Sequence, residues 1–173
     1  ARLVNDLLDM SAMESGKFNL AITEFDINQV ISLCILNLEH KIQEKGLNVK
    51  ATFHNNRAYV LGDRDRIIQV VTNIIENSIK YSNDDGEIKI DVYSKGEKVY
   101  VDIFNSGECI EEKELNKIWD RFYKSDKSRT NKLSTGLGLP IVRSILSQHN
   151  EDIWVKNIEG KGVSFIFTLK KSH

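Results

Sequence analysis

The sequence predicts an α/β (α+β) two-layer sandwich: a mixed sheet of about five strands with about three helices on one face, plus an N-terminal helix. Two observations lead to this prediction. Residues 88–92 and 99–103 alternate apolar and polar side chains on either side of an SKGE turn, which is typical of a β-hairpin. Amphipathic helices separate this hairpin from other strand-like segments, and each must bury its apolar stripe against a neighbour.

The N-terminal residues 1–15 place apolar side chains along one helical stripe, and Gly16 follows as a stop signal. A helix of this length is marginal alone, so the stripe needs a partner. That partner is either the following domain or a second copy of the chain, and an ordinary packing helix is the simpler interpretation.

Two further helices have recognisable start signals. Asp26 is placed to cap the first, which ends near Gly46, and Asp63 is placed to cap the second, which runs to about Tyr81. The segments LNVKATF and AYVLG between them are predicted to be short strands.

The second half of the chain continues with a short helix around EEKELNKIW and a polar, basic stretch at residues 124–135, which we expect to be a mobile loop. A helix follows over residues 138–149, where Pro140 fits the first turn because it sacrifices no helical hydrogen bond there. The segments DIWVKNI and GVSFIFTLK are predicted to be the last strands.

Composition restricts the class of protein. A chain of 173 residues, 40% of them hydrophobic, can form one core, and its well-mixed net charge of -1 argues against a nucleic-acid or anionic membrane partner. Cys34 and Cys109 form neither a disulfide framework nor a zinc pattern, which favours a reducing cytosol. No apolar run approaches the roughly 20 residues of a membrane span. The first residues resemble a cut through a longer protein, so a membrane anchor further upstream remains open.

A polar stripe along the third predicted helix is the first candidate site. Arg66, Gln69, Asn73, Asn77 and Lys80 follow one another at three- and four-residue spacings. Solvation would explain such a stripe, but asparagine is a poor helix former. The amide oxygens suit a magnesium ion that already carries triphosphate, and the lysine can neutralise phosphate charge.

Two glycine motifs are candidates for close ligand approach. Asn105 and Ser106 end a strand before Gly107, which permits a turn or a close backbone approach. The segment STGLGL opens a helix, where Gly136 and Gly138 let backbone N–H groups face a phosphate. A plain turn and an ordinary loop-to-helix junction are the structural alternatives.

The order of these motifs resembles that of bacterial sensor histidine kinases. TNIIENSIKYS looks like their asparagine box, IFNSGECI like the first glycine box, WDRFYKSDKS like the phenylalanine box and STGLGLPIV like the second glycine box. The similarity covers about residues 22–170, and RLVNDLLDMS resembles the end of the second helix of their dimerisation and phosphoacceptor domain.

The resemblance implies two parts of the chain. Residues 1–20 would be the end of the dimerisation helix with a linker, and residues 21–173 the catalytic ATP-binding domain. Its layered α/β fold would be the one shared with gyrase, heat-shock chaperone and mismatch-repair ATPases.

The resemblance also implies cofactors, ATP and Mg²⁺, and roles for individual residues. Asn77 would be the magnesium ligand, and Asn105 would accept a hydrogen bond from the adenine amine. Phe122 and Tyr123 would anchor a lid over residues 124–135. The catalytic residues would be Asn73, Lys80 and Lys124. The expected nucleotide contacts are Asn73, Asn77, Lys80, Tyr81, Asn105, Gly107, Ile110, Phe122, Tyr123, Thr135, Gly136, Leu137, Gly138 and Leu139.

Four positions depart from the family pattern. Asn105 replaces an aspartate, so it keeps a carbonyl acceptor without the charge, and its amide can flip to present a donor. Cys109 and Ser134 replace glycines, and Lys124 stands where many members have arginine. These changes lower the expected affinity for ATP and leave the expected fold unchanged.

An acceptor histidine is expected outside this chain. None of His40, His54, His149 and His173 has the sequence context of a phosphoacceptor, so each is interpreted as structural or solvated. The resemblance implies a homodimeric kinase with its own dimerisation and phosphoacceptor domain. It would be a cytoplasmic domain of a kinase anchored in the cell membrane, and it would pass phosphate to a response regulator.

Two other classes of function stay open. Asn105, Cys109 and Ser134 motivate a degenerate nucleotide-binding or scaffold module. An ATP hydrolase or serine kinase of the same superfamily is the other, but related hydrolases have a water-activating glutamate at the position of Asn73. Because an amide nitrogen cannot take up that proton, the kinase is favoured.

Overall fold

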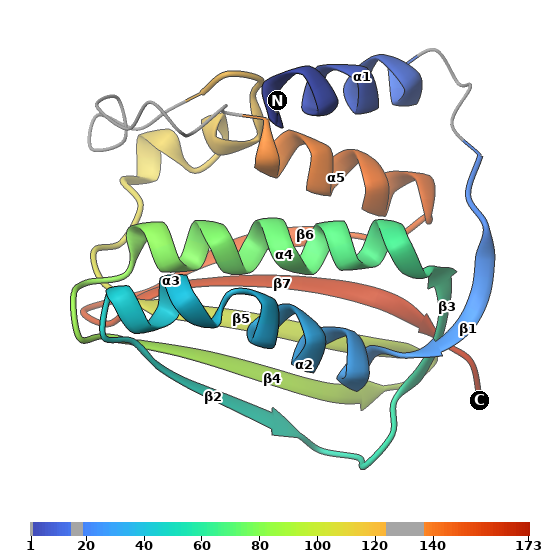
Figure 1. Ribbon diagram of the computed structural model, residues 1–173, viewed down its shortest axis with the longest axis horizontal. Coiled ribbons are helices and arrows are strands. Elements are labelled where there is room, and N and C mark those ends of the chain that lie inside the picture. The colour runs from blue at the N-terminus through green and yellow to red at the C-terminus, as the bar shows by residue number, and fades with distance from the viewer. Residues whose placement is uncertain (1, 15–18, 124–136) are drawn as a thin grey trace.

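The computed structural model describes residues 2–14, 19–123 and 137–173 of the chain. Within them, one mixed sheet carries the helices on a single face (Figure 1). The strands are β1 (Ile22–Asp26), β2 (Asn48–Phe53), β3 (Tyr59–Asp63), β4 (Glu87–Lys95), β5 (Lys98–Ser106), β6 (Ile153–Ile158) and β7 (Gly162–Lys171). The helices are α1 (Arg2–Glu14), α2 (Ile27–Asn37), α3 (Glu39–Glu44), α4 (Arg64–Tyr81) and α5 (Gly138–Gln148). Two 3-10 turns cover Glu112–Glu114 and Lys117–Trp119.

This architecture confirms the predicted sandwich, but the sheet is larger than expected. The described residues form seven strands, compared with the predicted sheet of about five and with the six segments predicted individually as strands. The strand without a counterpart in the prediction is β1, whose first three residues are all exposed and so show no alternation. The sequence predicts its last residue, Asp26, only as a helix cap, and the carboxylate does accept a hydrogen bond from the Asn28 N–H in that role.

The strand order is β1-β3-β7-β5-β4-β2, and β6 also pairs with β7. β4 and β5 form the predicted hairpin, with Val92 opposite Val101. β5 pairs on its other side with β7, where Val101 lies opposite Phe167. β2 runs parallel to β4, and the other described pairs are antiparallel. Every second residue of β5 is buried, so one face of the sheet meets the helices.

Two predicted helices are divided or shortened. The helix capped by Asp26 divides into α2 and α3 because Leu38, at φ −102° and ψ 7°, leaves the α-helical region. The short helix expected around EEKELNKIW is instead a pair of 3-10 turns. Hydrogen bonds three residues apart close them, from the Leu115 N–H to the Glu112 carbonyl and from the Asp120 N–H to the Lys117 carbonyl.

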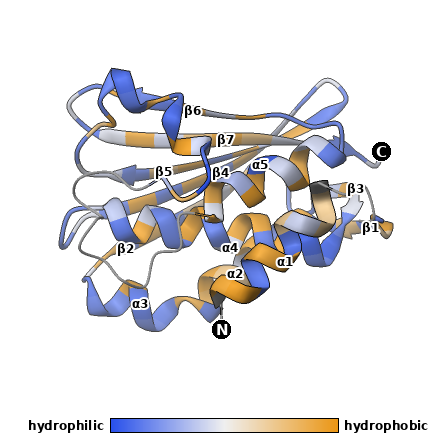
Figure 2. Ribbon diagram, turned by 90° about the horizontal axis from the view of Figure 1, so that it is seen from above, coloured by the Kyte–Doolittle hydropathy of each residue, from blue (hydrophilic) through white to orange (hydrophobic). Residues whose placement is uncertain are grey.

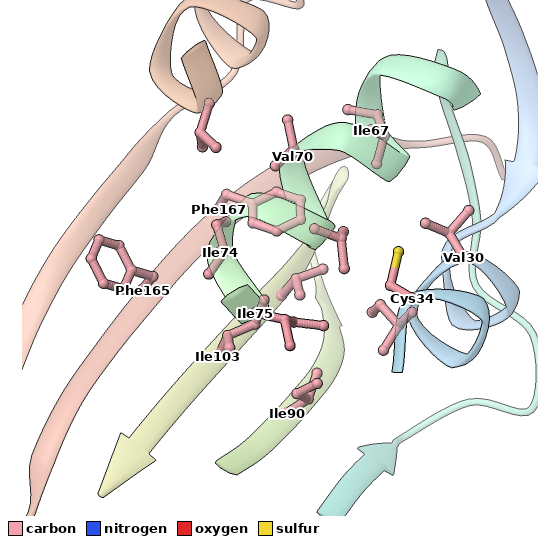
Figure 3. Close-up of a cluster of buried hydrophobic side chains, with 14 of the residues drawn as sticks. Val30, Cys34, Ile67, Val70, Ile74, Ile75, Ile90, Ile103, Phe165 and Phe167 are labelled. Carbon is pink, nitrogen blue, oxygen red and sulfur yellow. The ribbon is translucent and has the colours of Figure 1, made fainter. Parts of the chain in front are cut away.

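The core lies between the sheet and helices α2, α4 and α5. Figure 3 shows Phe165 and Phe167 of β7 beside Ile74 of α4 and Ile103 of β5, all fully buried or nearly so. Seen from above in Figure 2, hydrophobic and polar residues alternate along α1, α4 and α5, so each of these helices presents an apolar stripe. No helix within the described residues is both long and apolar enough to cross a membrane.

Replacing Phe167 by alanine is expected to lower the free energy of unfolding by about 3–5 kcal/mol, because it leaves a cavity in the middle of the core. Phe167 is fully buried. Urea unfolding followed by circular dichroism measures the change. The control is Leu36→Ala on α2, a position 64% exposed, where a change within about 0.5 kcal/mol is expected. Equal losses in the two variants would contradict this description of the core.

Candidate functional site

The polar stripe of α4 divides into two parts with different partners. Near the start of the helix, the Gln69 side chain donates a hydrogen bond of 3.0 Å to the Asp9 carboxylate of α1. The Arg66 guanidinium lies 3.5 Å from the same carboxylate and donates a 3.0 Å hydrogen bond to the Gln69 side-chain oxygen. This part of the stripe therefore binds α1, and the candidate ligand site is confined to Asn73, Asn77 and Lys80.

Asn73 connects α4 with the start of α5. Its side-chain amide donates a hydrogen bond of 3.4 Å to the carbonyl of Gly138, which is 65 residues away in the chain. Pro140 lies in the first turn of α5 as predicted, and Leu137 before the helix is fully buried. The structure thus brings Gly138, the last glycine of the second glycine motif, to the middle of the polar stripe.

Gly107 lies against the other end of α4. Its backbone has φ +140°, and a Cβ atom there would lie 2.7 Å from the carbonyl oxygen of Tyr81. The N–H of Asn83 donates to the Ser106 carbonyl at 3.3 Å, which ties the end of β5 to the residues just after the helix. The first glycine motif is therefore in contact with the turn that carries Lys80 and Tyr81, whose ammonium and ring centroid are 5.1 Å apart.

Asn105 is buried at the end of β5, with only 1% of its surface exposed. Its amide nitrogen donates a hydrogen bond of 3.2 Å to the Ser106 carbonyl, which orients the amide. In this orientation Oδ1 is the atom available to accept a hydrogen bond from a ligand. If the amide flipped so that its NH2 group faced the ligand, the hydrogen bond to the Ser106 carbonyl would be lost.

The residues after Gly107 are fixed to β6 and β7. The side chain of Asn157 accepts a 3.0 Å hydrogen bond from the Ile110 N–H and donates one of 2.8 Å to the Ile110 carbonyl. Cys109, an exposed free thiol, lies 3.4 Å from the carbonyl of Gly162 and has no positive φ. The cysteine is thus accommodated without backbone strain, and Asn157 is a supporting residue that the sequence reasoning missed. A lone asparagine within a strand carries no signal that could have identified it.

The remaining expected contact residues divide between described and undescribed segments. Tyr123 and Leu139 are half-buried and pack on the core, whereas Phe122 is 55% exposed and has φ +61°. Lys124, Thr135 and Gly136 lie outside the described residues, as do Ser134 and the whole segment 124–135.

Three of the four histidines in the described residues make structural or surface contacts, and His173 is the exposed terminal residue. His149 uses both ring nitrogens: Nε2 lies 3.0 Å from the Asp63 N–H as its acceptor, and Nδ1 is 2.8 Å from the Ile145 carbonyl. His40 and His54 each lie within 3 Å of a neighbouring carboxylate on the surface. None of these three contacts lies on the face of α4 that carries Asn73 and Asn77.

A comparison with protein-family models gives a match over the second part of the chain. The model described as histidine kinase-, DNA gyrase B-, and HSP90-like ATPase matches residues 62–173. The chain belongs to this ATPase family. The matched region contains α4, Gly107 and α5, which are the elements that meet at the candidate site.

Two similar proteins with high coverage of this chain are sensor kinases. The sensor histidine kinase WalK of Bacillus subtilis (strain 168) is 39% identical over 171 residues, which cover 97% of this chain and 28% of WalK. The sensor protein kinase WalK of Staphylococcus aureus is 36% identical over 177 residues, covering 97% of this chain and 41% of that protein. The chain thus spans well under half the length of these relatives.

Solved structures agree with the fold. The nucleotide-free catalytic domain of histidine kinase ThkA has 34% identity and a TM-score of 0.77, covering 87% of this chain and 97% of that one. Full-length ShkA in complex with AMPPNP superposes with a TM-score of 0.87, covering 99% of this chain and 36% of that one. Its identity of 20% supports the fold alone.

Replacing Asp9 by alanine is expected to loosen α1 from α4, because the Arg66 and Gln69 side chains lose their shared acceptor. Hydrogen exchange should show weaker amide protection in α1 and unchanged protection in α4. Ser11→Ala, at an exposed position of the same helix, is the control and should retain protection. Unchanged protection of α1 in the Asp9 variant would show that the contact does not hold this helix.

Replacing Gly107 by alanine is expected to lower the free energy of unfolding by more than about 2 kcal/mol, since strain and a backbone clash add together. Gly96→Ala is the matched control, because its φ is +61° and a Cβ there meets nothing within 4 Å. That variant should lose only about 1 kcal/mol, the cost of a positive φ. Urea unfolding distinguishes them, and equal losses would exclude the close contact with Tyr81.

Proposed function

We propose that the chain is the ATP-binding catalytic domain of a two-component sensor histidine kinase, which transfers the γ-phosphoryl group of ATP to a histidine outside this chain. The observation that carries the proposal is the meeting of two glycine motifs at one helix. Gly107 contacts the last turn of α4, and Gly138 contacts Asn73 in its middle. Gly107 and Gly138 lie at two points along the polar stripe, and neither has a side chain. The backbone at both points can therefore come close to a phosphorylated ligand.

The residues of this site match the chemistry of a magnesium–nucleotide complex. Asn77 is half-buried on α4, and its side chain has no hydrogen-bond partner among the described residues. Its amide oxygen would bind Mg²⁺, a hard cation that prefers oxygen ligands and keeps water and phosphate oxygens in its other positions. Bound magnesium would neutralise part of the triphosphate charge. No group of three or more His, Cys, Asp or Glu side chains in the described part of the chain forms an alternative metal site.

The other contacts follow from position. Lys80 would bind phosphate oxygens, Tyr81 would contact the ribose or base, and Oδ1 of Asn105 would accept a hydrogen bond from the adenine amine. Lys124, Thr135 and Gly136 complete the proposed set on the basis of the motifs alone. Catalysis then depends on positioning and charge neutralisation, because phosphoryl transfer demands little covalent chemistry of the protein.

A kinase is favoured over a hydrolase by the neighbourhood of Asn73. The amide of Asn73 cannot act as the general base that activates water. The nearest carboxylate on the same helix is that of Glu76, and it lies 3.1 Å from the Lys41 ammonium of α3. This ion pair with Lys41 holds the Glu76 carboxylate toward α3.

The partners that we propose are a second copy of the kinase and a response regulator. In α1, Leu3, Val4, Leu7 and Leu8 are exposed. This stripe suits the tail of a dimerisation helix that continues in a homodimer. ThkA has been solved in complex with the response regulator protein TrrA, and the match covers 98% of this chain. By analogy, a response regulator would receive the phosphate from the kinase. We place the domain in the cytoplasm, as part of a membrane-anchored kinase.

Titration of the chain with ATP and Mg²⁺ by calorimetry tests the proposal. Saturable binding is expected, and Asn77→Ala should weaken the affinity for ATP and Mg²⁺ by at least about tenfold. Losing a residue that only supports a metal ligand already lowers metal affinity by about this factor. Gln69→Ala is the matched control, because it lies on the same stripe but binds α1. It should leave the affinity for ATP unchanged.

Two results would overturn the proposal. If the intact chain does not bind ATP, a degenerate nucleotide-binding or scaffold module becomes the better description, and Asn105 and Cys109 become the residues to revert. If the chain hydrolyses ATP with multiple turnovers in the absence of any acceptor, it is a hydrolase.

A further inference from the structure

Lys45, which follows α3, reaches across to the last turn of α4. Its ammonium donates hydrogen bonds to two consecutive main-chain carbonyls, those of Ile79 at 2.8 Å and Lys80 at 2.9 Å. The two carbonyls lie directly before Tyr81, the residue that contacts Gly107. A side chain from outside the proposed nucleotide site is therefore bonded to the backbone of a residue within it.

The geometry is physically favourable for both partners. The last carbonyls of an α-helix have no partner further along the helix, and the helix dipole makes this end negative. The Lys45 ammonium supplies both a donor and a positive charge, and the Ile79 carbonyl also accepts a 2.8 Å hydrogen bond from the Ser82 hydroxyl. Burial lowers the pKa of Lys45, and the nearby Asp84 carboxylate partly opposes this effect. Hydrogen bonds of a charge that has lost water are stronger than those of an exposed one.

The backbone of Lys45 is itself held in place. Its carbonyl accepts a hydrogen bond of 3.0 Å from the Asp85 N–H. The next residue, Gly46, has φ +68°, and a Cβ there would collide with the Asp85 carboxylate. The N–H of Asn48 then donates to the Gly86 carbonyl at 3.0 Å. The turn after α3 is thus bonded to the turn after α4, and the lysine starts from a fixed point.

We infer that Lys45 is a positioning residue of the nucleotide site: it fixes the last turn of α4 and so the directions of the Lys80 and Tyr81 side chains. The inference rests on the proposed function, because it assigns these two side chains to ATP. The turn is held from two sides, by Lys45 at its carbonyls and by Gly107 at Tyr81. Without the lysine, the turn can fray, and ATP binding must then restore its order.

The chain offers a matched control for this inference. Lys41 also extends from α3 to α4, but its ammonium meets the Glu76 side chain at 3.1 Å instead of the helix backbone. Replacing either lysine by methionine removes one positive charge and keeps an unbranched side chain. The two variants therefore differ at the end of α4: only Lys45→Met removes the lysine bond to the Lys80 carbonyl and leaves the Ile79 carbonyl with the Ser82 hydroxyl alone.

Calorimetric titration of the chain with ATP and Mg²⁺ is the test. Lys45→Met should raise the dissociation constant by about fivefold, within the usual range for coupling between a supporting residue and a neighbouring site. Lys41→Met should leave it unchanged. Lys45→Arg should restore most of the affinity, because its planar fork can also donate to two carbonyls. A generally loosened fold would not be rescued in this way, and urea unfolding of each variant measures that loosening directly.

Wild-type affinity in a folded Lys45→Met variant would overturn the inference, and so would equal weakening by Lys41→Met. If Lys45→Met does not fold, Lys45→Gln takes its place, since its amide retains one donor. A raised dissociation constant then supports the inference, and an unchanged one overturns it. Failure of the wild-type chain to bind ATP is a different result, because it rejects the proposed function itself.

Discussion

The burial of one face of α4 is the constraint on which the rest of the structure depends. Its buried positions follow helical spacing and meet the inner face of the sheet: Ile67, Val70, Val71, Ile74, Ile75, Ser78 and Ile79. Each large apolar side chain contributes about 1.5–3 kcal/mol when it leaves water. This burial sets the rotation of the helix about its axis. The side chains on the other face, which include Asn73 and Asn77, are therefore directed away from the sheet without any polar contact having to place them.

The same constraint brings distant motifs together. β5 ends where α4 ends, so Gly107 meets Tyr81, and α5 packs beside α4, so Gly138 meets Asn73. Each contact joins two residues that are far apart in the sequence. The contact at Tyr81 requires a residue without a side chain at position 107. The contact at Asn73 uses the backbone carbonyl of Gly138. The site is thus a product of packing between three elements, and its polar residues occupy positions that the core has already determined.

Much of this could be predicted from the sequence where a signal is local. Asp63 marks the start of α4, and the alternation in residues 88–92 and 99–103 identifies the central hairpin. β1 could not be predicted, because an exposed edge strand of five residues has no buried alternation. The 3-10 turns could not be separated from a helix by composition alone. Fold class and family follow from the motifs, whereas the strand number needed the three-dimensional pairing.

The candidate site residues show the same division. Asn73, Asn77 and Lys80 stand out because amides are unusual at helical spacing, but Arg66 and Gln69 belong to the same pattern and serve a different purpose. Their partner, Asp9, lies more than 50 residues earlier in the chain. Lys45 and Asn157 gave no signal, since one resembles an ordinary surface lysine and the other an ordinary strand residue. Long-range contacts of this kind become visible only when the chain is folded.

The contact of Asp9 with α4 also depends on how α1 is rotated about its own axis. Successive residues of an α-helix are separated by about 100° around its axis. Asp9 faces Arg66 and Gln69 in one angular setting of α1, and its neighbours Leu8 and Met10 are apolar. A turn of α1 by a single residue would replace the carboxylate with Leu8, which has no acceptor atom, or with Met10, whose thioether is only a weak acceptor. The pairing therefore depends on the rotation of α1 about its axis as well as on its distance from α4. A rotation of α1 about that axis would break both polar contacts with α4.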